Sequence, residues 1–264
     1  MNSTTASTEG SVHFVIEGAV ARVVFDRPRA RNAMTWSMYE KLGAICESIR
    51  ANPEIRVVAF AGAGGEAFVA GTDIAQFTSF ETADAGIAYE RRLDGFLHAI
   101  DTLPVPTVAA VEGWCVGGGL AIAAVCDVRI ATPTSRFGVP IARTLGNCLS
   151  TVIYSRLLAE FGLARTKRML LCAEFLSAEE AREAGFVSAV VEPSDLKAHL
   201  DHLLDRIAHQ APITMRVSKE AIHRLLNATS VDDEDLLRQA YGSEDFREGV
   251  RAFIAKRKPQ WRGH

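Results

Sequence analysis

Three consecutive glycines, Gly117, Gly118 and Gly119, form the most informative pattern in the sequence. An apolar run at 107–111 precedes them, and a stretch of small and apolar residues at 120–126 follows. We expect a strand, a glycine turn and a helix start, which together leave backbone N–H groups unpaired and pointing outward. Because glycine has no Cβ, another molecule can approach these amides closely. The pattern predicts a site for negative oxygen, either in a phosphate or in a developing oxyanion.

A second site of this kind follows the apolar strand expected at 55–61, and it comprises Ala70, Gly71, Thr72, Asp73 and Ile74. If the strands at 55–61 and 107–112 are neighbours, the two sites can face each other across one carbonyl oxygen. A single donor in such a site is worth roughly 2.7–4 kcal/mol of transition-state stabilisation. In the alternative interpretation, the glycines only let a helix pack closely against a sheet. Spacing alone leaves both interpretations open.

The elements that must position these sites alternate between strands and helices in the first part of the chain. Residues 12–17 and 19–25 predict a hairpin, Thr35 is expected to cap a helix at 36–49, and 83–101 predicts another helix. After a strand at 128–131 the pattern becomes mostly helical. We expect helices at 149–161, 165–171, 178–184, 196–209, 213–226 and 232–256, with one strand at 187–191. This order predicts a βαβ-type core followed by a C-terminal helical region.

Composition excludes several classes of function. The net charge of −3 provides no broad basic field, so nucleic acid is not an expected partner. No apolar run reaches membrane-spanning length. Residues 1–11 are small and polar and are expected to form a disordered tail. The five cysteines have no CxxC spacing, and we expect buried, reduced thiols and a cytoplasmic protein; they are Cys46, Cys115, Cys126, Cys148 and Cys172.

Several segments, in order along nearly the whole chain, resemble the enoyl-CoA hydratase/isomerase (crotonase) family. They are Phe25 to Met34, Ala67 to Ile74 and Val111 to Gly119, and further matches follow at 126–131, 176–186 and 253–261. The resemblance implies an α/β fold, a crotonase-like spiral of ββα units with a C-terminal helical trimerisation region. It divides the chain into a tail at 1–11, a core at 12–200 and an oligomerisation region at 201–264. It also implies a homotrimer or a dimer of trimers, and no cofactor other than coenzyme A as part of the substrate.

The same resemblance assigns roles to individual residues. It implies that the amides of Thr72 and Gly118 hold the thioester oxygen while negative charge builds on an enolate. It places contacts to coenzyme A on the loop Arg29, Ala30 and Arg31, and it directs Lys256 to the nucleotide phosphates, within the subunit or across a subunit boundary. For any one of these cations, a solvated surface position is an equally good interpretation. The remaining substrate contacts implied are Ala70, Asp73, Ile74, Gly117 and Ile141.

The sequence departs from the family pattern where the best-known members carry two glutamates. Those positions are occupied by Ala121 and Ile141, which cannot hold or pass a proton. Because each general acid or base contributes about 10²–10⁴-fold, we expect hydration by the two-glutamate route to be very weak. Candidate replacements are Glu90 and, in the polar loop 142–148, Arg143 and Cys148.

Each of these candidates also has a structural interpretation. Glu90 could lie on a solvated face, the loop could simply bury a thiol, and Asp73 could cap the helix after Thr72. His199 and His202 have no acidic or cysteine partner that would complete a metal site. Two hypotheses therefore remain open: an acyl-CoA-transforming enzyme with relocated acid–base groups, and a non-catalytic acyl-CoA-binding protein.

Overall fold

The computed structural model describes residues 10–227 and 232–263. Its first sheet has the order β1-β2-β3-β5-β7-β10, and a second sheet has the order β4-β6-β8-β9. The first sheet consists of β1 (Ser11–Glu17), β2 (Val20–Asp26), β3 (Val57–Gly62), β5 (Thr107–Val111), β7 (Val128–Ala131) and β10 (Ala189–Val190). The second consists of β4 (Ala67–Val69), β6 (Trp114–Val116), β8 (Arg136–Gly138) and β9 (Leu176–Ser177).

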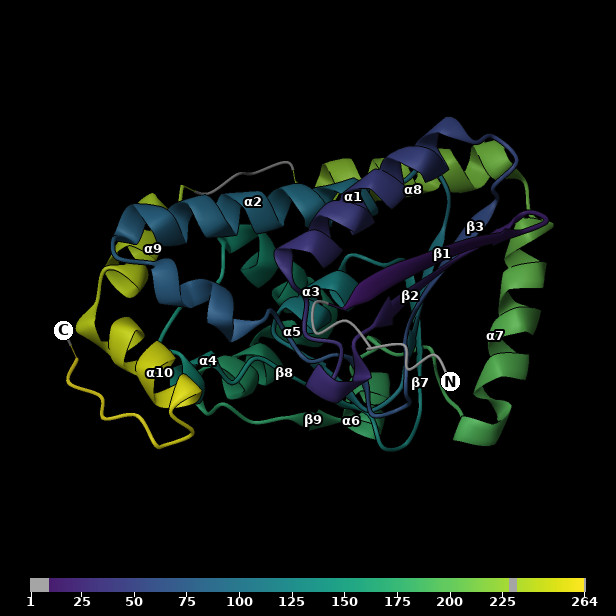
Figure 1. The fold of residues 1–264 in the computed structure, drawn as a ribbon. Helices are drawn as coiled ribbons and strands as arrows, with labels where there is room; N and C mark the ends of the chain where they lie inside the picture. Colours follow the sequence, from purple (N-terminus) through teal and green to yellow (C-terminus); the bar gives the residue numbers. More distant parts are fainter. Residues whose placement is uncertain (1–9, 228–231, 264) are drawn as a thin grey trace, which may run out of the picture.

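Helices surround these sheets (Figure 1). In the first half of the chain they are the 3-10 helices η1 (Pro28–Ala30) and η2 (Ile74–Ser79), with α1 (Trp36–Ala51), α2 (Ala83–Asp101) and α3 (Gly118–Ala124). In the second half they are α4 (Ile141–Thr144), α5 (Thr151–Leu171), α6 (Ala178–Glu183), α7 (Pro193–Ala208), α8 (Pro212–Leu226), α9 (Glu234–Tyr241) and α10 (Glu244–Ile254).

The first sheet confirms the predicted hairpin and βαβ core. β1 and β2 pair antiparallel, and the pairs β2–β3, β3–β5, β5–β7 and β7–β10 are all parallel. The predicted adjacency of the two strands holds, because Val58 on β3 lies opposite Thr107 on β5. The Thr35 side chain accepts a hydrogen bond from the Met38 amide, as expected of the cap of α1.

Alternate side chains of the central strands enter two separate apolar clusters. Val58 and Phe60 of β3 belong to the main core, which also contains the buried faces of α1, α2 and α3. Val57 and Ala59 point to the other face, where Leu200, Leu203 and Leu204 of α7 cover them. Figure 1 shows α7 on one side of the sheet and α1 on the other.

The second sheet was not predicted from the sequence. Its strands are two or three residues long, which is too short for an alternating pattern to be visible. It changes the setting of the glycines, because β6 rather than β5 leads directly into Gly117. The small sheet thus brings the two glycine sites together through the parallel pair β4–β6.

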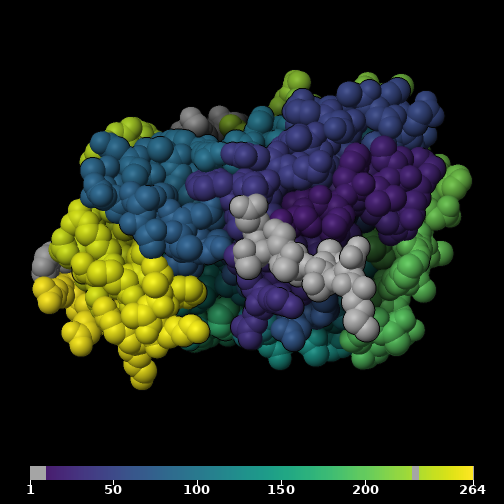
Figure 2. All heavy atoms as spheres, in the orientation of Figure 1, coloured from purple at the N-terminus to yellow at the C-terminus, as the bar shows by residue number. Residues whose placement is uncertain are grey.

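The C-terminal helices follow the prediction with one correction. α5 is interrupted at Gly162, whose φ of 72° and ψ of 166° are non-helical, so it consists of two helical segments, as the helices expected at 149–161 and 165–171 predict. The prediction of a single helix at 232–256 is wrong, because the helix is interrupted at Gly242 and Ser243, between α9 and α10. The Ser243 hydroxyl caps α10 by accepting from the Phe246 amide, a local bond that starts a new helix. Figure 2 shows the C-terminal residues gathered in a lobe at the end of the molecule opposite α7.

Two further expectations concern the chain's surface. β1 begins at Ser11, inside the segment 1–11 expected to be a tail, and residues 1–9 lie outside the described residues. All five cysteines are free, but burial of all of them is wrong: Cys172 is exposed because it follows the last turn of α5 at the surface. No helix in the described ranges is long and apolar enough to cross a membrane.

Candidate functional site

The backbone around Thr72 is held by a single parallel bridge to Met34. The Met34 amide donates to the Gly71 carbonyl, and the Asp73 amide donates to the Met34 carbonyl, both at 2.9 Å. These two hydrogen bonds occupy the Gly71 carbonyl and the Asp73 amide, on either side of Thr72. The Thr72 N–H itself is directed away from Met34. The local fold therefore presents one unpaired amide.

The glycines bring a second amide to the same place. Gly117 has φ 55° and ψ −121°, a conformation that favours glycine, and its amide donates to the Gly138 carbonyl at 3.0 Å. A Cβ on Gly119 would lie 2.0 Å from the Val69 carbonyl oxygen, so only glycine lets α3 approach β4 this closely. Gly118, between them, is the first residue of α3.

The amides of Thr72 and Gly118 lie close together. The position that a Cβ of Gly118 would occupy is 3.8 Å from the Thr72 nitrogen. Within residues 10–227 and 232–263, neither N–H has a hydrogen-bond acceptor. Two adjacent unpaired amides are the arrangement that stabilises a negatively charged oxygen.

Two tyrosines that sequence reasoning missed complete this region. The Thr72 Oγ1 lies 2.9 Å from the Tyr39 hydroxyl and 2.9 Å from the Tyr89 hydroxyl. Burial raises the pKa of both phenols, so both stay protonated at neutral pH. Tyr39 lies on α1 and Tyr89 on α2, and neither helix sequence indicates that the two side chains approach the same residue.

The turn expected to contact coenzyme A lies beside the Thr72 loop. The Arg31 carbonyl accepts from the Ala70 amide at 3.0 Å, and Arg29 and Ala30 lie just before it in η1. The Arg31 guanidinium lies over the Trp114 ring, 5.9 Å from its centre. Lys256 is exposed and directly follows the end of α10.

Asp73 and Ile74 have structural roles. The Asp73 carboxylate accepts from the Ala75 amide at 3.0 Å, which confirms the predicted cap, and it pairs with Arg27 at 2.8 Å. Ile74 packs against the main core. At the positions of the family's glutamates, Ala121 is buried in α3, and Ile141 is half-buried against the core at the start of α4.

Glu90 is not on a solvated face, so that interpretation is wrong. Its side chain is 1% exposed; it accepts a short bond from the Tyr241 hydroxyl and one of 3.1 Å from the Ser150 amide. Burial raises the pKa of Glu90 to about 8, with a further contribution from the neighbouring Asp94. A pKa near 8 favours the protonated carboxyl group at neutral pH.

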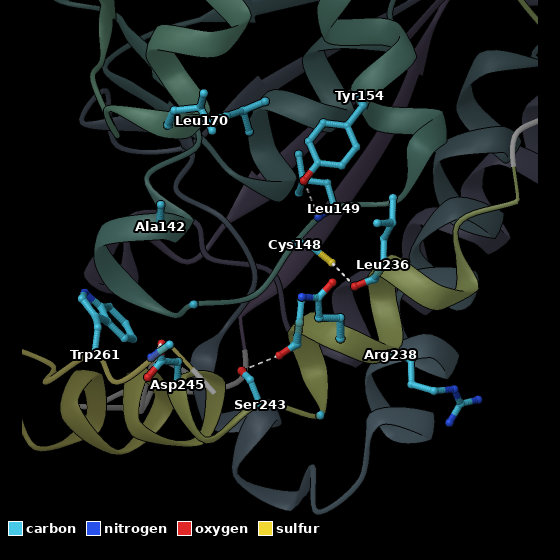
Figure 3. A pocket seen from close by; sticks show the side chains of 16 residues that line it. Ala142, Cys148, Leu149, Tyr154, Leu170, Leu236, Arg238, Ser243, Asp245 and Trp261 are labelled. Carbon is cyan, nitrogen blue, oxygen red and sulfur yellow. Dashed lines mark hydrogen bonds between the residues drawn. The ribbon is translucent and has the colours of Figure 1, made fainter.

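Cys148 and Arg143 have different contacts, although both belong to the polar loop. The Cys148 sulfur points toward the Leu236 carbonyl at 3.9 Å and lines a cavity of about 940 Å³ between α5, α9 and α10 (Figure 3). Burial raises its pKa to about 12, which keeps it a thiol and a poor nucleophile. The Arg143 guanidinium lies 5.6 Å from the centre of the Phe175 ring. Neither Thr72 nor Gly118 lines this cavity.

Tyr241 connects two of the candidates. Its hydroxyl contacts the Glu90 carboxyl group and the Cys148 carbonyl at 3.4 Å, and it accepts a hydrogen bond from the side-chain Nδ2 of Asn147 at 3.3 Å. Glu90 and the backbone of Cys148 thus share one buried cluster. Among the residues that the structure places, no three His, Cys, Asp or Glu side chains are grouped to hold a metal ion.

Comparison with known proteins identifies the family. The family model described as enoyl-CoA hydratase/isomerase matches residues 15–264. A short-chain-enoyl-CoA hydratase from Clostridium acetobutylicum is 32% identical over 92% of this chain and 94% of its own. An (E)-benzylidenesuccinyl-CoA hydratase from Thauera aromatica is 33% identical over 94% and 97%, respectively.

Solved structures agree with these sequence relatives. A methylmalonyl-CoA decarboxylase in complex with 2-nitronate-propionyl-CoA superposes with a TM-score of 0.87 at 28% identity, covering 96% of this chain and 98% of that one. An enoyl-CoA hydratase/carnithine racemase from Magnetospirillum magneticum has a TM-score of 0.78 at 34% identity, with 96% of both chains covered. The crotonase-like fold expected from the sequence is therefore confirmed, and the chain belongs to the enoyl-CoA hydratase/isomerase family.

Proposed function

We propose that this protein is an enzyme that binds an acyl-CoA thioester and stabilises its enolate between the amides of Thr72 and Gly118. The observation that carries the proposal is the closeness of these two amides, neither of which has an acceptor within the described chain. A thioester oxygen between them gains negative charge as the enolate forms, and fixed donors stabilise that charge without reorganising. Arg29, Arg31 and Lys256 are proposed contacts to the phosphates of coenzyme A.

The residues at the two positions where the family carries glutamates limit which reactions this site can catalyse. Ala121 and Ile141 supply no general base to activate water, so addition of water to an enoyl thioester lacks its usual catalysts. Loss of carbon dioxide from a malonyl-type thioester produces the same enolate without a base, because the electrons of the breaking C–C bond form it. The fold similarity to a methylmalonyl-CoA decarboxylase supports testing this class first.

The second candidate is a non-catalytic acyl-CoA-binding protein. It is favoured by the apolar residues Ala121 and Ile141, and by the raised pKa that keeps Cys148 an uncharged thiol. Arg143 is exposed and lies over an aromatic ring. In this alternative the oxygen-binding amides remain and turnover has been lost.

A paired binding and turnover assay separates the two candidates. Titration calorimetry measures the affinity for butyryl-CoA, and chromatography follows turnover of crotonyl-CoA, a halo-acyl-CoA and methylmalonyl-CoA. We expect micromolar binding, turnover of at least one thioester, and hydration of crotonyl-CoA to be the weakest. Binding without any turnover would support the binding protein, and absence of binding would reject both candidates.

We also propose that the protein assembles as a trimer or a pair of trimers through its C-terminal helices. α8 buries none of its side chains, yet Ile213, Val217, Ile222 and Leu225 are apolar and more than half exposed. A helix of this kind is typical of a surface covered by another subunit. Light scattering coupled to gel filtration should give three or six times the mass of one chain.

A charge on α8 should weaken this assembly. Leu225→Asp would place a carboxylate in an apolar interface, so we expect a shift toward smaller species in the same measurement. Val15→Asp, at an exposed position on β1, is the matched control and should leave the mass unchanged. A wild-type protein that elutes as a single chain at micromolar concentration would contradict the proposal.

A further inference from the structure

Three hydroxyl groups meet beside the proposed oxygen-binding amides. We call Tyr39, Thr72 and Tyr89 the hydroxyl trio. The Thr72 Oγ1 is central, with one phenol oxygen at 2.9 Å on each side. Tyr39 is 0% exposed, Tyr89 6% and Thr72 8%, so all three oxygens must find their hydrogen bonds inside the protein or from a ligand.

The trio has one more hydrogen than it can use internally. Three hydroxyls carry three hydrogens, but only two O···O contacts join them. Neither phenol has another hydrogen-bond partner in the portion of the chain that the structure describes. One O–H therefore remains available to a further acceptor.

The central position of the Thr72 oxygen determines which of the three hydroxyl hydrogens has no acceptor within the trio. A hydroxyl oxygen has two acceptor sites, so Thr72 can accept from both phenols at once. If Thr72 instead donated to Tyr39, that phenol's hydrogen would be buried without an acceptor, at a cost of about 1–3 kcal/mol. The arrangement in which both phenols donate satisfies both tyrosines and leaves the Thr72 hydrogen free.

The free hydrogen lies next to the site already described. The Cβ position of Gly118 is 2.8 Å from the Tyr39 oxygen, 3.2 Å from the Thr72 Oγ1 and 3.8 Å from the Thr72 nitrogen. Side chain and amide of Thr72 thus border the same small space. Resting on the proposed function, we propose that the Thr72 hydroxyl donates a third hydrogen bond to the thioester oxygen.

In this arrangement Tyr39 and Tyr89 are positioning residues. By donating to the Thr72 oxygen they fix its rotamer, and they polarise its O–H bond, which strengthens the bond to a ligand. Because burial raises the pKa of both phenols, they remain donors throughout the neutral range. The trio thus supplies a pre-oriented donor whose strength grows as the ligand oxygen becomes negative.

Infrared spectroscopy of a bound thioester tests the assignment directly. Butyryl-CoA labelled with ¹³C at the carbonyl is bound to the wild type and to T72V, T72S, Y89F and Y39F/Y89F, and the carbonyl stretch is recorded. We expect T72V, which keeps the backbone amide and the side-chain shape, to raise the stretching frequency. T72S should restore it, and Y39F/Y89F should shift it partway, by freeing the Thr72 rotamer.

Binding of an enolate-like ligand provides the second readout. T72V should weaken binding of 2-nitronate-propionyl-CoA about tenfold more than binding of butyryl-CoA, because a bond to a charged acceptor is the stronger. Thr166→Val is the matched control: Thr166 is also buried and donates to the Leu157 carbonyl at 2.9 Å, within α5. It should change neither frequency nor affinity.

The outcomes separate this inference from the proposed function. An unchanged frequency and affinity in T72V, with normal binding by the wild type, would overturn the role of Thr72 alone. If Y89F raised the frequency as much as T72V, the spare hydrogen would belong to Tyr89 and the assignment would be wrong. A wild type that binds neither ligand would overturn the proposed function and the third donor with it.

Discussion

Replacing Gly118 by alanine should lower kcat/KM for an acyl-CoA thioester about 10²–10³-fold, while the chain still folds. The new methyl group would lie 2.8 Å from the Tyr39 hydroxyl and 3.2 Å from the Thr72 Oγ1, too close for both to stay in place. It would also stand beside the Thr72 nitrogen, in the space proposed for the thioester oxygen. Loss of one such donor costs about 2.7–4 kcal/mol of transition-state stabilisation, which sets the expected range.

The choice of Gly118 rather than Gly119 makes this variant informative. A Cβ at Gly119 would meet the Val69 backbone at 2.0 Å, so Gly119→Ala would damage the fold itself. At Gly118 the two nearest atoms are the ends of side chains, and the nearest backbone atom, the Thr72 nitrogen, is at an ordinary contact distance of 3.8 Å. Gly95→Ala is the matched control, because a Cβ there meets nothing within 4 Å, and its activity should equal that of the wild type.

Steady-state kinetics and thermal unfolding of both variants provide the measurement. A Gly118→Ala protein that melts like the wild type and retains full activity would show that this amide does not touch the reacting oxygen. If the protein is a non-catalytic binder, the same substitution should instead reduce affinity for 2-nitronate-propionyl-CoA.

The meeting of the two glycine sites was predictable because the information is local. Glycines at 71 and 117–119 mark places where the backbone turns sharply or lies close to other atoms, and parallel strands place such turns at one edge. Local residue patterns also predicted where α2 begins and ends, and they predicted that Asp73 caps the helix that follows it. Patterns of this kind can be recognised in the sequence without knowledge of the rest of the fold.

The hydroxyl trio and the environment of Glu90 were not predictable for the opposite reason. Tyr39 and Tyr89 are 50 positions apart in the sequence and meet only because α1 and α2 pack over the same loop. Glu90 is followed by Arg91 and Arg92, which suggested a solvated face, but α9 covers it with Tyr241. When a segment distant in the sequence buries a residue, the residues next to it carry no periodic pattern that predicts the burial.

Glu90 should make this protein less stable as the pH rises through neutrality, and Glu90→Gln should remove that dependence. The native pKa is raised to about 8 from the usual 4.5, so between these values the folded chain holds a proton that the unfolded chain has lost. Stability then falls by about 1.4 kcal/mol per pH unit, and the fall ends once the native group ionises near pH 8. Glutamine keeps the bonds to Tyr241 and Ser150 without a charge to bury.

Urea unfolding at pH 5.5, 6.5 and 7.5 measures the effect as a difference between proteins. Over this interval we expect the wild type to lose about 2–3 kcal/mol relative to Glu90→Gln. Asp94 and Asp233 also face this cluster, and the difference between the two proteins largely cancels their own titration. Glu40→Gln, at an exposed carboxylate that pairs with Arg92 on the surface, should track the wild type at every pH.

Parallel curves for the wild type and Glu90→Gln would mean that Glu90 is already ionised in the native protein at neutral pH. The short bond from Tyr241 would then be one from a neutral phenol to a carboxylate, and burial would not control this group. Diverging curves would instead establish a buried, protonated acid joined through Tyr241 to the Cys148 backbone.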